Sequence, residues 1–165
     1  EAIPLSSDQT PYRKDERERI KKTGARVITY DMLEGKIPIH ENWDSIELGV
    51  DVDEGGDPPR VWHPTGKYPG NAFTRSIGDN LSEPLGVYAI PELTTHVLLD
   101  LDEYIVVASD GIWEFMTNQQ CLDIITAAKN LDDACEAIVS EAYRLWITNE
   151  VRTDDITAII IKRKM

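Results

Sequence analysis

The sequence has few cysteines, few basic residues and no long apolar run. Its 165 residues include two cysteines, Cys121 and Cys135, which fall at apolar positions of expected helices and lack the spacing of a metal-binding motif. No stretch approaches the roughly 20 consecutive apolar residues that span a bilayer, and none resembles a signal peptide. We therefore expect reduced thiols, no membrane span, and a location in the cytoplasm or nucleus.

Basic residues are outnumbered by acidic ones: 17 Lys and Arg stand against 30 Asp and Glu, which gives a net charge of −13. This charge opposes binding to polyanions such as nucleic acid or an anionic membrane. The one segment rich in basic residues, 13–22, mixes both signs at helical spacing, which is typical of a solvated helix face. We therefore expect no nucleic-acid partner.

The length of the chain fits one domain or a part of a larger fold. Because the chain begins at Glu1 and not at Met, we expect a processed or partial chain with further motifs upstream. The pattern of the first third predicts a helix over 14–23, ended by Gly24, and a strand over 26–30.

A change of composition marks the next stretch, residues 34–70. Prolines alternate there with glycines, and acidic residues outnumber basic ones. Long irregular segments inside a compact domain are usually functional or exposed, so this composition predicts an acidic flap or insertion. We expect Trp43 and Trp62 to hold its two ends.

Short strands and two helices are predicted beyond Gly70. Apolar runs at 87–90, 94–99 and 104–108 indicate strands, and the four residues between the last two indicate a hairpin. Thr117 with Gln120 forms a capping box that opens one helix. A longer helix follows, which Asn130 can cap and in which apolar residues, Trp146 among them, recur at the spacing of a packed helix.

Two apolar strands of this sequence adjoin acidic residues. The run 104–108 leads directly to Asp110 and Gly111, and the β-branched run 156–161 follows Asp154 and Asp155. A glycine beside the acid allows a sharp turn and a close approach of the backbone to an ion. Carboxylates at two strand ends can share one hard metal ion, Mg²⁺ or Mn²⁺. Two ordinary turn aspartates are the alternative interpretation.

Three segments resemble the metal-dependent protein serine/threonine phosphatases of type 2C, most like the plant and protist members. Residues 72–79 (Ala-Phe-Thr-Arg-Ser-Ile-Gly-Asp) are similar to that family's Ser/Thr-Arg-x-x-Gly-Asp motif. Residues 107–114 are similar to its Ser-Asp-Gly-x-Trp-Asp motif, with Glu114 in place of Asp. Residues 153–157 are similar to its closing Asp-Asn-hydrophobic-Thr motif, with Asp155 in place of Asn. The resemblance extends from about Ala2 to Lys162.

This resemblance implies an α+β fold, a β-sandwich of two antiparallel sheets flanked by helices, of which residues 1–165 are the C-terminal portion. It implies a centre of two or more Mg²⁺ or Mn²⁺ ions with Asp110 and Asp154 as ligands. Additional residues that the resemblance places at or beside the ions are Glu114, Asp155, Gly111 and Asp79. The implied activity is hydrolysis of phosphoserine and phosphothreonine in proteins by metal-activated water, without a covalent intermediate.

Other motifs of that family do not occur in this sequence. The Asp-Gly-His-Gly-type motif that carries the bridging Asp, the Arg that holds phosphate and the His proposed as general acid all lack a counterpart. We therefore expect no catalytic residue here beyond the metal ligands, and an inactive chain in isolation. Expected partners are a phosphoprotein substrate and the N-terminal half of the domain, with strand exchange into a dimer as an alternative.

Three competing interpretations concern the acidic residues. Residues 51–57 resemble the start of an EF-hand loop, but the twelfth place is Trp62 instead of a bidentate Glu, so we favour an acidic loop. Asp100 and Asp102 resemble an aspartyl-nucleophile motif, but the immediate return into a strand favours a turn. Finally, the departures at Glu114 and Asp155 leave room for a pseudophosphatase or regulatory binding module. The histidines, expected to be non-catalytic, are His40, His63 and His96.

Overall fold

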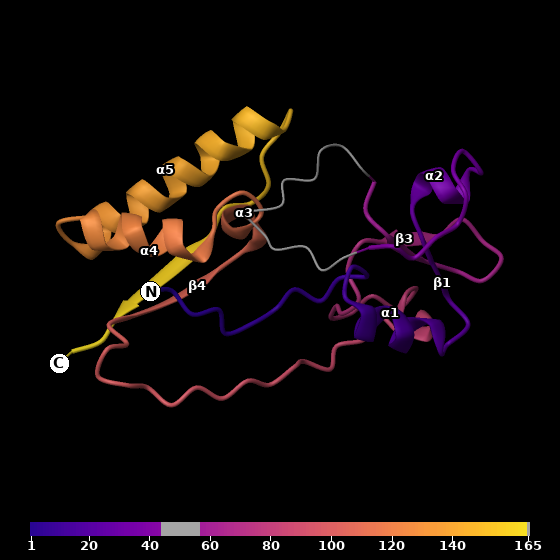
Figure 1. Cartoon of the computed structure of the whole chain (residues 1–165), viewed down its shortest axis with the longest axis horizontal. Coiled ribbons are helices and arrows are strands. Elements are labelled where there is room, and N and C mark those ends of the chain that lie inside the picture. Colours follow the sequence, from indigo (N-terminus) through magenta and orange to yellow (C-terminus); the bar gives the residue numbers. More distant parts are fainter. Residues whose placement is uncertain (44–56, 165) are drawn as a thin grey trace. The chain divides into compact units, whose positions relative to one another are not determined.

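The computed structural model describes residues 1–43 and 57–164. The chain divides into two compact units, which are described separately (Figure 1). The N-terminal unit comprises described residues 6–43 and 57–94, and the C-terminal unit comprises described residues 1–5 and 95–164. None of the described helices is both long enough and apolar enough to cross a membrane.

The N-terminal unit is built on a three-stranded antiparallel sheet with the order β1-β2-β3. Its register pairs Val27 with Val61 across β1 and β2, and the core beneath it contains Ile20, Leu85 and Val87. Trp62 is buried and donates from its indole nitrogen to the carbonyl of Ile28 at 2.8 Å. The elements of the unit are α1 (Lys14–Lys21), β1 (Arg26–Ile28), α2 (Tyr30–Leu33), β2 (Arg60–Trp62), β3 (Pro69–Asn71) and the 3-10 helix η1 (Glu83–Leu85).

The predicted insertion at 34–70 overlaps this sheet. Strand β2 is the central strand of the sheet, and β3 begins at Pro69. Regular structure therefore begins inside the predicted insertion, at Arg60. A three-residue strand flanked by prolines is too short to reveal itself by alternation, and it forms because both its neighbours pair with it. Trp62 is buried, and Trp43 packs against the same core, while their role in holding the two ends of the insertion stays a prediction. Residues 44–56, in the middle of the predicted acidic insertion, lie outside the described part of the chain.

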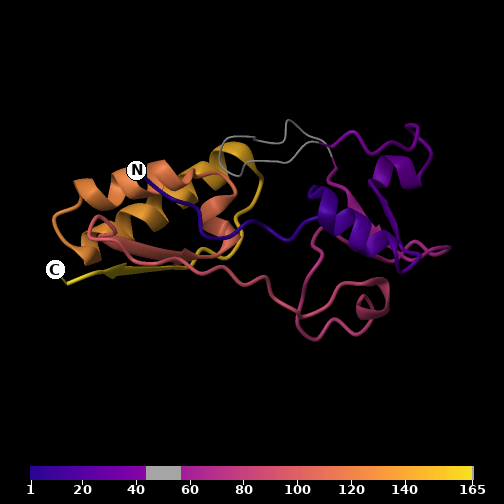
Figure 2. The ribbon, with the colours of Figure 1, turned by 60° about the horizontal axis from the view of Figure 1, so that its bottom comes forward.

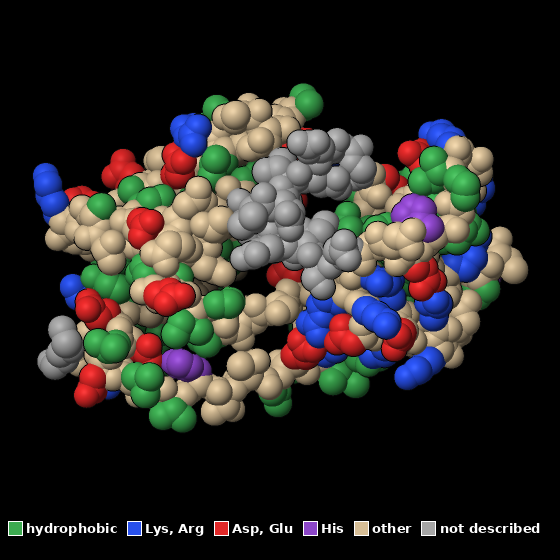
Figure 3. All heavy atoms as spheres, viewed as in Figure 1, with side chains coloured by type: hydrophobic (Ala, Val, Ile, Leu, Met, Phe, Trp, Pro, Cys, Tyr) green, Lys and Arg blue, Asp and Glu red, His purple; other side chains and the backbone are tan. Residues whose placement is uncertain are grey.

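Helix α1 differs from the solvated face predicted for 13–22, although acidic and basic side chains do intermingle over its surface (Figure 3). Glu16 is only 2% exposed. Its carboxylate accepts hydrogen bonds from Arg19 at 2.6 Å, from Arg75 at 2.8 Å and from the hydroxyl of Thr74 at 2.5 Å. Burial alone raises the pKa of Glu16, but these hydrogen bonds outweigh it and hold the pKa well below the ordinary value. The Thr-Arg pair of the first motif therefore anchors α1.

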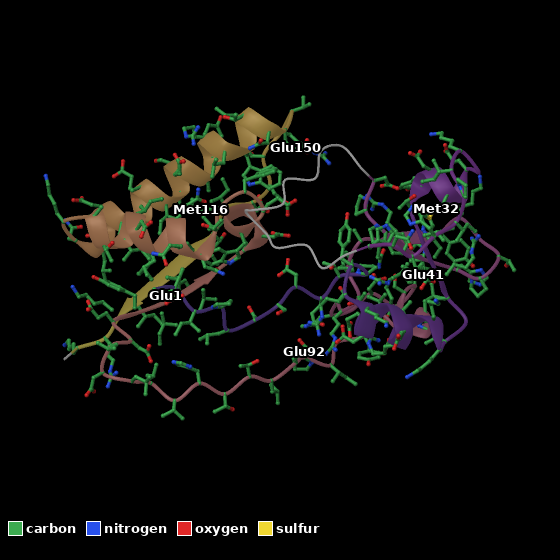
Figure 4. The ribbon with its side chains drawn as sticks, in the orientation of Figure 1. Glu1, Met32, Glu41, Glu92, Met116 and Glu150 are labelled. Carbon is green, nitrogen blue, oxygen red and sulfur yellow. The ribbon has the colours of Figure 1, made fainter. Side chains whose placement is uncertain are left out.

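A second ion pair extends this cluster beyond the helix. Arg13 donates to the carboxylate of Glu92 at 2.7 Å, and Gln9 donates to the same carboxylate at 2.5 Å. The hydrogen bonds from Arg13 and then Gln9 lower the pKa of Glu92 to about 2. Glu92 lies at the C-terminal end of the unit (Figure 4), so this pair fixes the chain where it leaves the sheet region.

The C-terminal unit packs two helices on one face of a two-stranded antiparallel sheet, as both ribbon views show (Figures 1 and 2). Its core includes Ile112, Met116, Ile125 and Ile138. The predicted caps are present: Thr117 and Gln120 form a capping box, and Asn130 caps the long helix. The elements of the unit are β4 (Tyr104–Ala108), α3 (Asp110–Trp113), α4 (Asn118–Ala127), α5 (Leu131–Asn149) and β5 (Ala158–Lys162).

The predicted hairpin between 94–99 and 104–108 is wrong. Strand β4 pairs with β5 along its whole length, from Tyr104 opposite Lys162 to Ala108 opposite Ala158. Residues 87–99 carry no regular structure. The carboxylate of Asp102 instead closes a local turn by accepting from the backbone of Leu99 at 2.7 Å. An apolar run forms a strand only where a partner strand supplies hydrogen bonds. Here the partner of β4 is β5, in which Ala158 lies opposite Ala108, fifty residues away. The α+β class with antiparallel sheets is confirmed.

Both cysteines occupy helices, as expected, and neither forms a disulfide. Cys121 is buried in α4, where desolvation raises the pKa of its thiol to about 11. Cys135 on α5 is half-buried.

Candidate metal site

The strands β4 and β5 bring the two acidic segments to one end of their sheet. Beyond the last strand pair, the backbone of Ser109 donates to the carbonyl of Thr157 at 2.9 Å. The hydroxyl of Ser109 accepts from the backbone of Thr157 at 3.1 Å and donates to the carbonyl of Asp155 at 2.8 Å. Ser109 therefore prolongs the pairing by side-chain hydrogen bonds, and it clamps the segment of Asp155 beside that of Asp110.

Gly111 allows this close approach. A Cβ atom at its position would lie 2.9 Å from the carbonyl carbon of Asp155, closer still to the carbonyl oxygen, and 3.1 Å from the Cα of Ile156. Such distances exclude any side chain unless the backbone moves. The backbone of Gly111 is helical, in α3, and the glycine provides room for the second acidic segment, while its predicted approach to an ion stays a prediction.

The carboxylates of the site face solvent. Asp110 is the first residue of α3, and Asp110, Asp154 and Asp155 are all exposed. The Oδ1 atom of Asp154 accepts from the backbone of Asp155 at 2.7 Å, which orients this carboxylate by a local hydrogen bond. Within residues 1–43 and 57–164, no three His, Cys, Asp or Glu side chains gather closely enough to hold a metal ion. The oxygen donors suit Mg²⁺ or Mn²⁺ but make up only part of a ligand set.

Helix α5 supports helix α3 at this end of the sheet. The indole nitrogen of Trp146 donates to the carbonyl of Gly111 at 2.8 Å, and Phe115 packs edge-on against the Trp146 ring with centroids 4.8 Å apart. Trp113 donates to the carbonyl of Ala108 at 3.1 Å. Sequence reasoning placed Trp146 only in a packed face. The available signal was that a buried indole nitrogen needs an acceptor, which loops near a helix end can supply.

Glu114 and Asp79 occupy different surroundings. Glu114 follows α3, and its backbone donates to the carbonyl of Asp110 at 2.8 Å. Asp79 belongs to the N-terminal unit, where its carboxylate accepts from the side chain of Asn71 at 2.7 Å and from the backbone of Ser82 at 3.2 Å. Hydrogen bonds from Ser82 and Asn71 lower the pKa of Asp79 below its ordinary value. In this chain Asp79 stabilises the turn before η1, and a role at the ions stays a prediction.

The histidines take part in local structure. His96 lies 2.9 Å from the carboxylate of Asp102, so this Asp serves a turn, as expected for the acidic pair 100–102. His63 stacks on Tyr68 with ring centroids 4.8 Å apart, and His40 packs near Trp43. The EF-hand-like stretch 51–57 falls outside the described residues except for Asp57, which pairs with Arg60 at 3.1 Å.

The fold resembles that of a solved protein of known class. The crystal structure of serine-threonine phosphatase 2C from Toxoplasma gondii matches 97% of the chain with a TM-score of 0.65. The two sequences are 20% identical, so this likeness concerns the fold, and the match covers 46% of the Toxoplasma chain.

Sequence comparison gives the same family. Probable protein phosphatase 2C 35 of Arabidopsis thaliana is 48% identical over 164 residues, which are 99% of this chain and 46% of that protein. Probable protein phosphatase 2C 64 of Oryza sativa subsp. japonica is 32% identical over 89% of this chain and 29% of that protein. The chain thus spans less than half the length of these relatives. Residues 1–151 match the family described as Protein phosphatase 2C, so the resemblance to plant members is confirmed, and the chain belongs to the protein phosphatase 2C family.

Proposed function

We propose that the protein containing this chain hydrolyses phosphoserine and phosphothreonine in other proteins, and that it depends on Mg²⁺ or Mn²⁺. The observation that carries the proposal is the clamp at the end of the β4–β5 sheet, where Ser109 and Gly111 hold the Asp155 segment against that of Asp110. Bound divalent ions would supply a water of lowered pKa as nucleophile and would offset the charge of the phosphate.

The residues of this chain would hold and orient part of the centre. Asp110 and Asp154 would bind the ions, since both are exposed and belong to segments that Ser109 holds together. Asp154 keeps one oxygen on a backbone donor, which limits its rotation. Trp146 binds the carbonyl of Gly111, so that helix α3, which begins at Asp110, keeps its position. Precise placement of ligands matters because Mg²⁺ requires near-octahedral geometry.

The remaining ligands and the groups that hold phosphate are proposed to come from the rest of a complete catalytic domain. The face of the β4–β5 sheet opposite the helices is apolar and exposed, with Val107 at 58%, Ile159 at 57% and Ile161 at 50%. An exposed apolar face of this kind is typical of a surface that other protein segments cover. We propose that the rest of the domain covers it, that the isolated chain is inactive, and that the protein acts in the cytoplasm or nucleus.

The test uses the whole protein that contains this chain, assayed on a phosphothreonine peptide with and without Mn²⁺. We expect Asp110→Ala and Asp154→Ala each to remove most of the activity while the fold is kept, because each change removes an exposed carboxylate. Asp123→Ala, an exposed acid on α4, is the matched control and should leave the activity unchanged. Full activity in a chelator, or equal activity of all three variants at limiting Mn²⁺, would overturn the proposal.

A further inference from the structure

The longest of the described helices, α5, carries three apolar side chains that are partly exposed. Val139, Tyr143 and Ile147 recur every fourth residue and are 38%, 53% and 55% exposed. The core of the unit lies on another side of the helix, where Ala134 and Ile138 are buried. Residues four apart lie on one side of a helix, so the three exposed side chains form a stripe about 12 Å long. Val139, Tyr143 and Ile147 are called the α5 stripe below.

Unpaired acidic residues border this stripe. Asp132 and Glu136 precede Val139 and Tyr143 by seven residues, two helical turns, so they lie on the same side of the helix. Both are exposed, and neither forms an ion pair with any described residue. Glu150 directly follows the end of the helix (Figure 4). The single cation of α5, Arg144, is engaged by Glu141 at 2.6 Å.

The apolar stripe and the acidic residues beside it together indicate which kind of partner would bind here. The apolar side chains favour a partner that buries them, and the carboxylates favour one that brings positive charge to the rim. A second copy of the chain would place acid against acid, and an anionic surface would be repelled for the same reason. The stripe has the spacing of a helical ridge, which packs well against apolar residues three and four apart on a second helix.

We propose that the α5 stripe and its acidic border bind a basic amphipathic helix of a partner protein. Its apolar residues would pack on Val139, Tyr143 and Ile147, and its Lys or Arg residues would face Asp132 and Glu136. This mode of binding, a helix laid on an apolar surface, is read as anchors at positions i, i+3, i+4 and i+7. The inference concerns an outer face of α5 and does not depend on the metal chemistry.

The probe is a fluorescein-labelled peptide of 18 residues made of Leu, Ala and Lys, with Leu at positions three and four apart and Lys on both flanks. Its binding to the whole protein that contains this chain is followed by fluorescence anisotropy. A scrambled peptide of the same composition has the same charge without an apolar face. We expect the amphipathic peptide to bind with a Kd of about 100 µM or below, and at least about tenfold more tightly than the scrambled one.

Two variants test the two parts of the surface. Tyr143→Ser removes the middle of the stripe and should weaken binding about tenfold. Glu136→Lys reverses a charge at the border and should weaken it about as much, more strongly at low salt. Asp123→Lys makes the same charge change on α4 and is the control, with an expected effect below about twofold. Circular dichroism verifies that each variant is folded, and Ile147→Ser replaces Tyr143→Ser if that variant fails.

Several outcomes would overturn the proposal. They are equal binding of the scrambled peptide, equal weakening by Asp123→Lys and Glu136→Lys, or no binding of the amphipathic peptide at about 1 mM. Light scattering of the whole protein without peptide gives a further criterion. A dimer that Tyr143→Ser converts to a monomer would assign the stripe to a second copy of the chain instead.

Discussion

For the substitution Gly111→Ala, helix propensity and tertiary packing predict opposite changes in stability. Alanine is favoured over glycine in a helix by up to about 1 kcal/mol, and Gly111 lies in α3 with an ordinary helical backbone. By local reasoning, this change should therefore stabilise the C-terminal unit. The structure predicts the opposite, because the added Cβ would lie 2.9 Å from the carbonyl carbon of Asp155 and 3.1 Å from the Cα of Ile156.

The size of the destabilisation depends on which atoms must move to make room for the added Cβ. The obstructing atoms are backbone, so no flexible side chain can rotate away, and overpacking of this kind costs about 1–3 kcal/mol. After the propensity gain is subtracted, we expect a net loss of about 0–2 kcal/mol in the free energy of unfolding of the C-terminal unit. The loss should concentrate at the clamp, where Ser109 donates to the carbonyls of Thr157 and Asp155.

Hydrogen exchange measured by NMR is the suitable assay, because it reports single amides within one unit. The amides of Ser109 and Thr157 should exchange about tenfold faster in Gly111→Ala, which corresponds to about 1.4 kcal/mol. Gly78→Ala is the control. Gly78 has a positive φ of 78° with open space around it, so this substitution strains the backbone of the N-terminal unit without a steric clash. Unchanged or slower exchange at Ser109 in Gly111→Ala would refute the steric argument.

Four further predictions concern groups that are wholly or partly buried. Glu16→Gln should destabilise the N-terminal unit by about 1–3 kcal/mol in a denaturant titration, because it removes the counter-charge that Glu16 gives to the half-buried guanidinium groups of Arg19 and Arg75. The pKa of Glu16 is lowered in the folded state, so its stabilisation is complete above pH 4.5 and is lost as the pH falls below that value; a circular dichroism titration should show a weaker acid dependence in Glu16→Gln. Trp146→Phe should cost about 1 kcal/mol through the lost hydrogen bond to Gly111, measured by thermal unfolding. A thiol reagent should label Cys135 before Cys121, and the order should vanish in denaturant.

The sequence alone determined those features that depend on residues within one or two turns of each other. The capping box at Thr117, the cap at Asn130 and the amphipathic pattern of the long helix all appeared where they were predicted. Family membership was equally accessible, because the motifs at 72–79, 107–114 and 153–157 are short and retain their order. The metal-ligand roles of Asp110 and Asp154 follow from the same motifs and remain predictions.

Tertiary structure decided the features that depend on segments far apart in the chain. The partner of β4 was predicted five residues away and proved to be β5, fifty residues away, since apolar runs with β propensity do not encode which edge they pair with. A side chain at position 111 is excluded by the backbone of Asp155. The buried carboxylate of Glu16 is paired by Arg75, which comes from another segment. In each case the deciding contact joins residues more than forty positions apart. Local patterns cannot specify such contacts, because they arise only when packing brings the segments together.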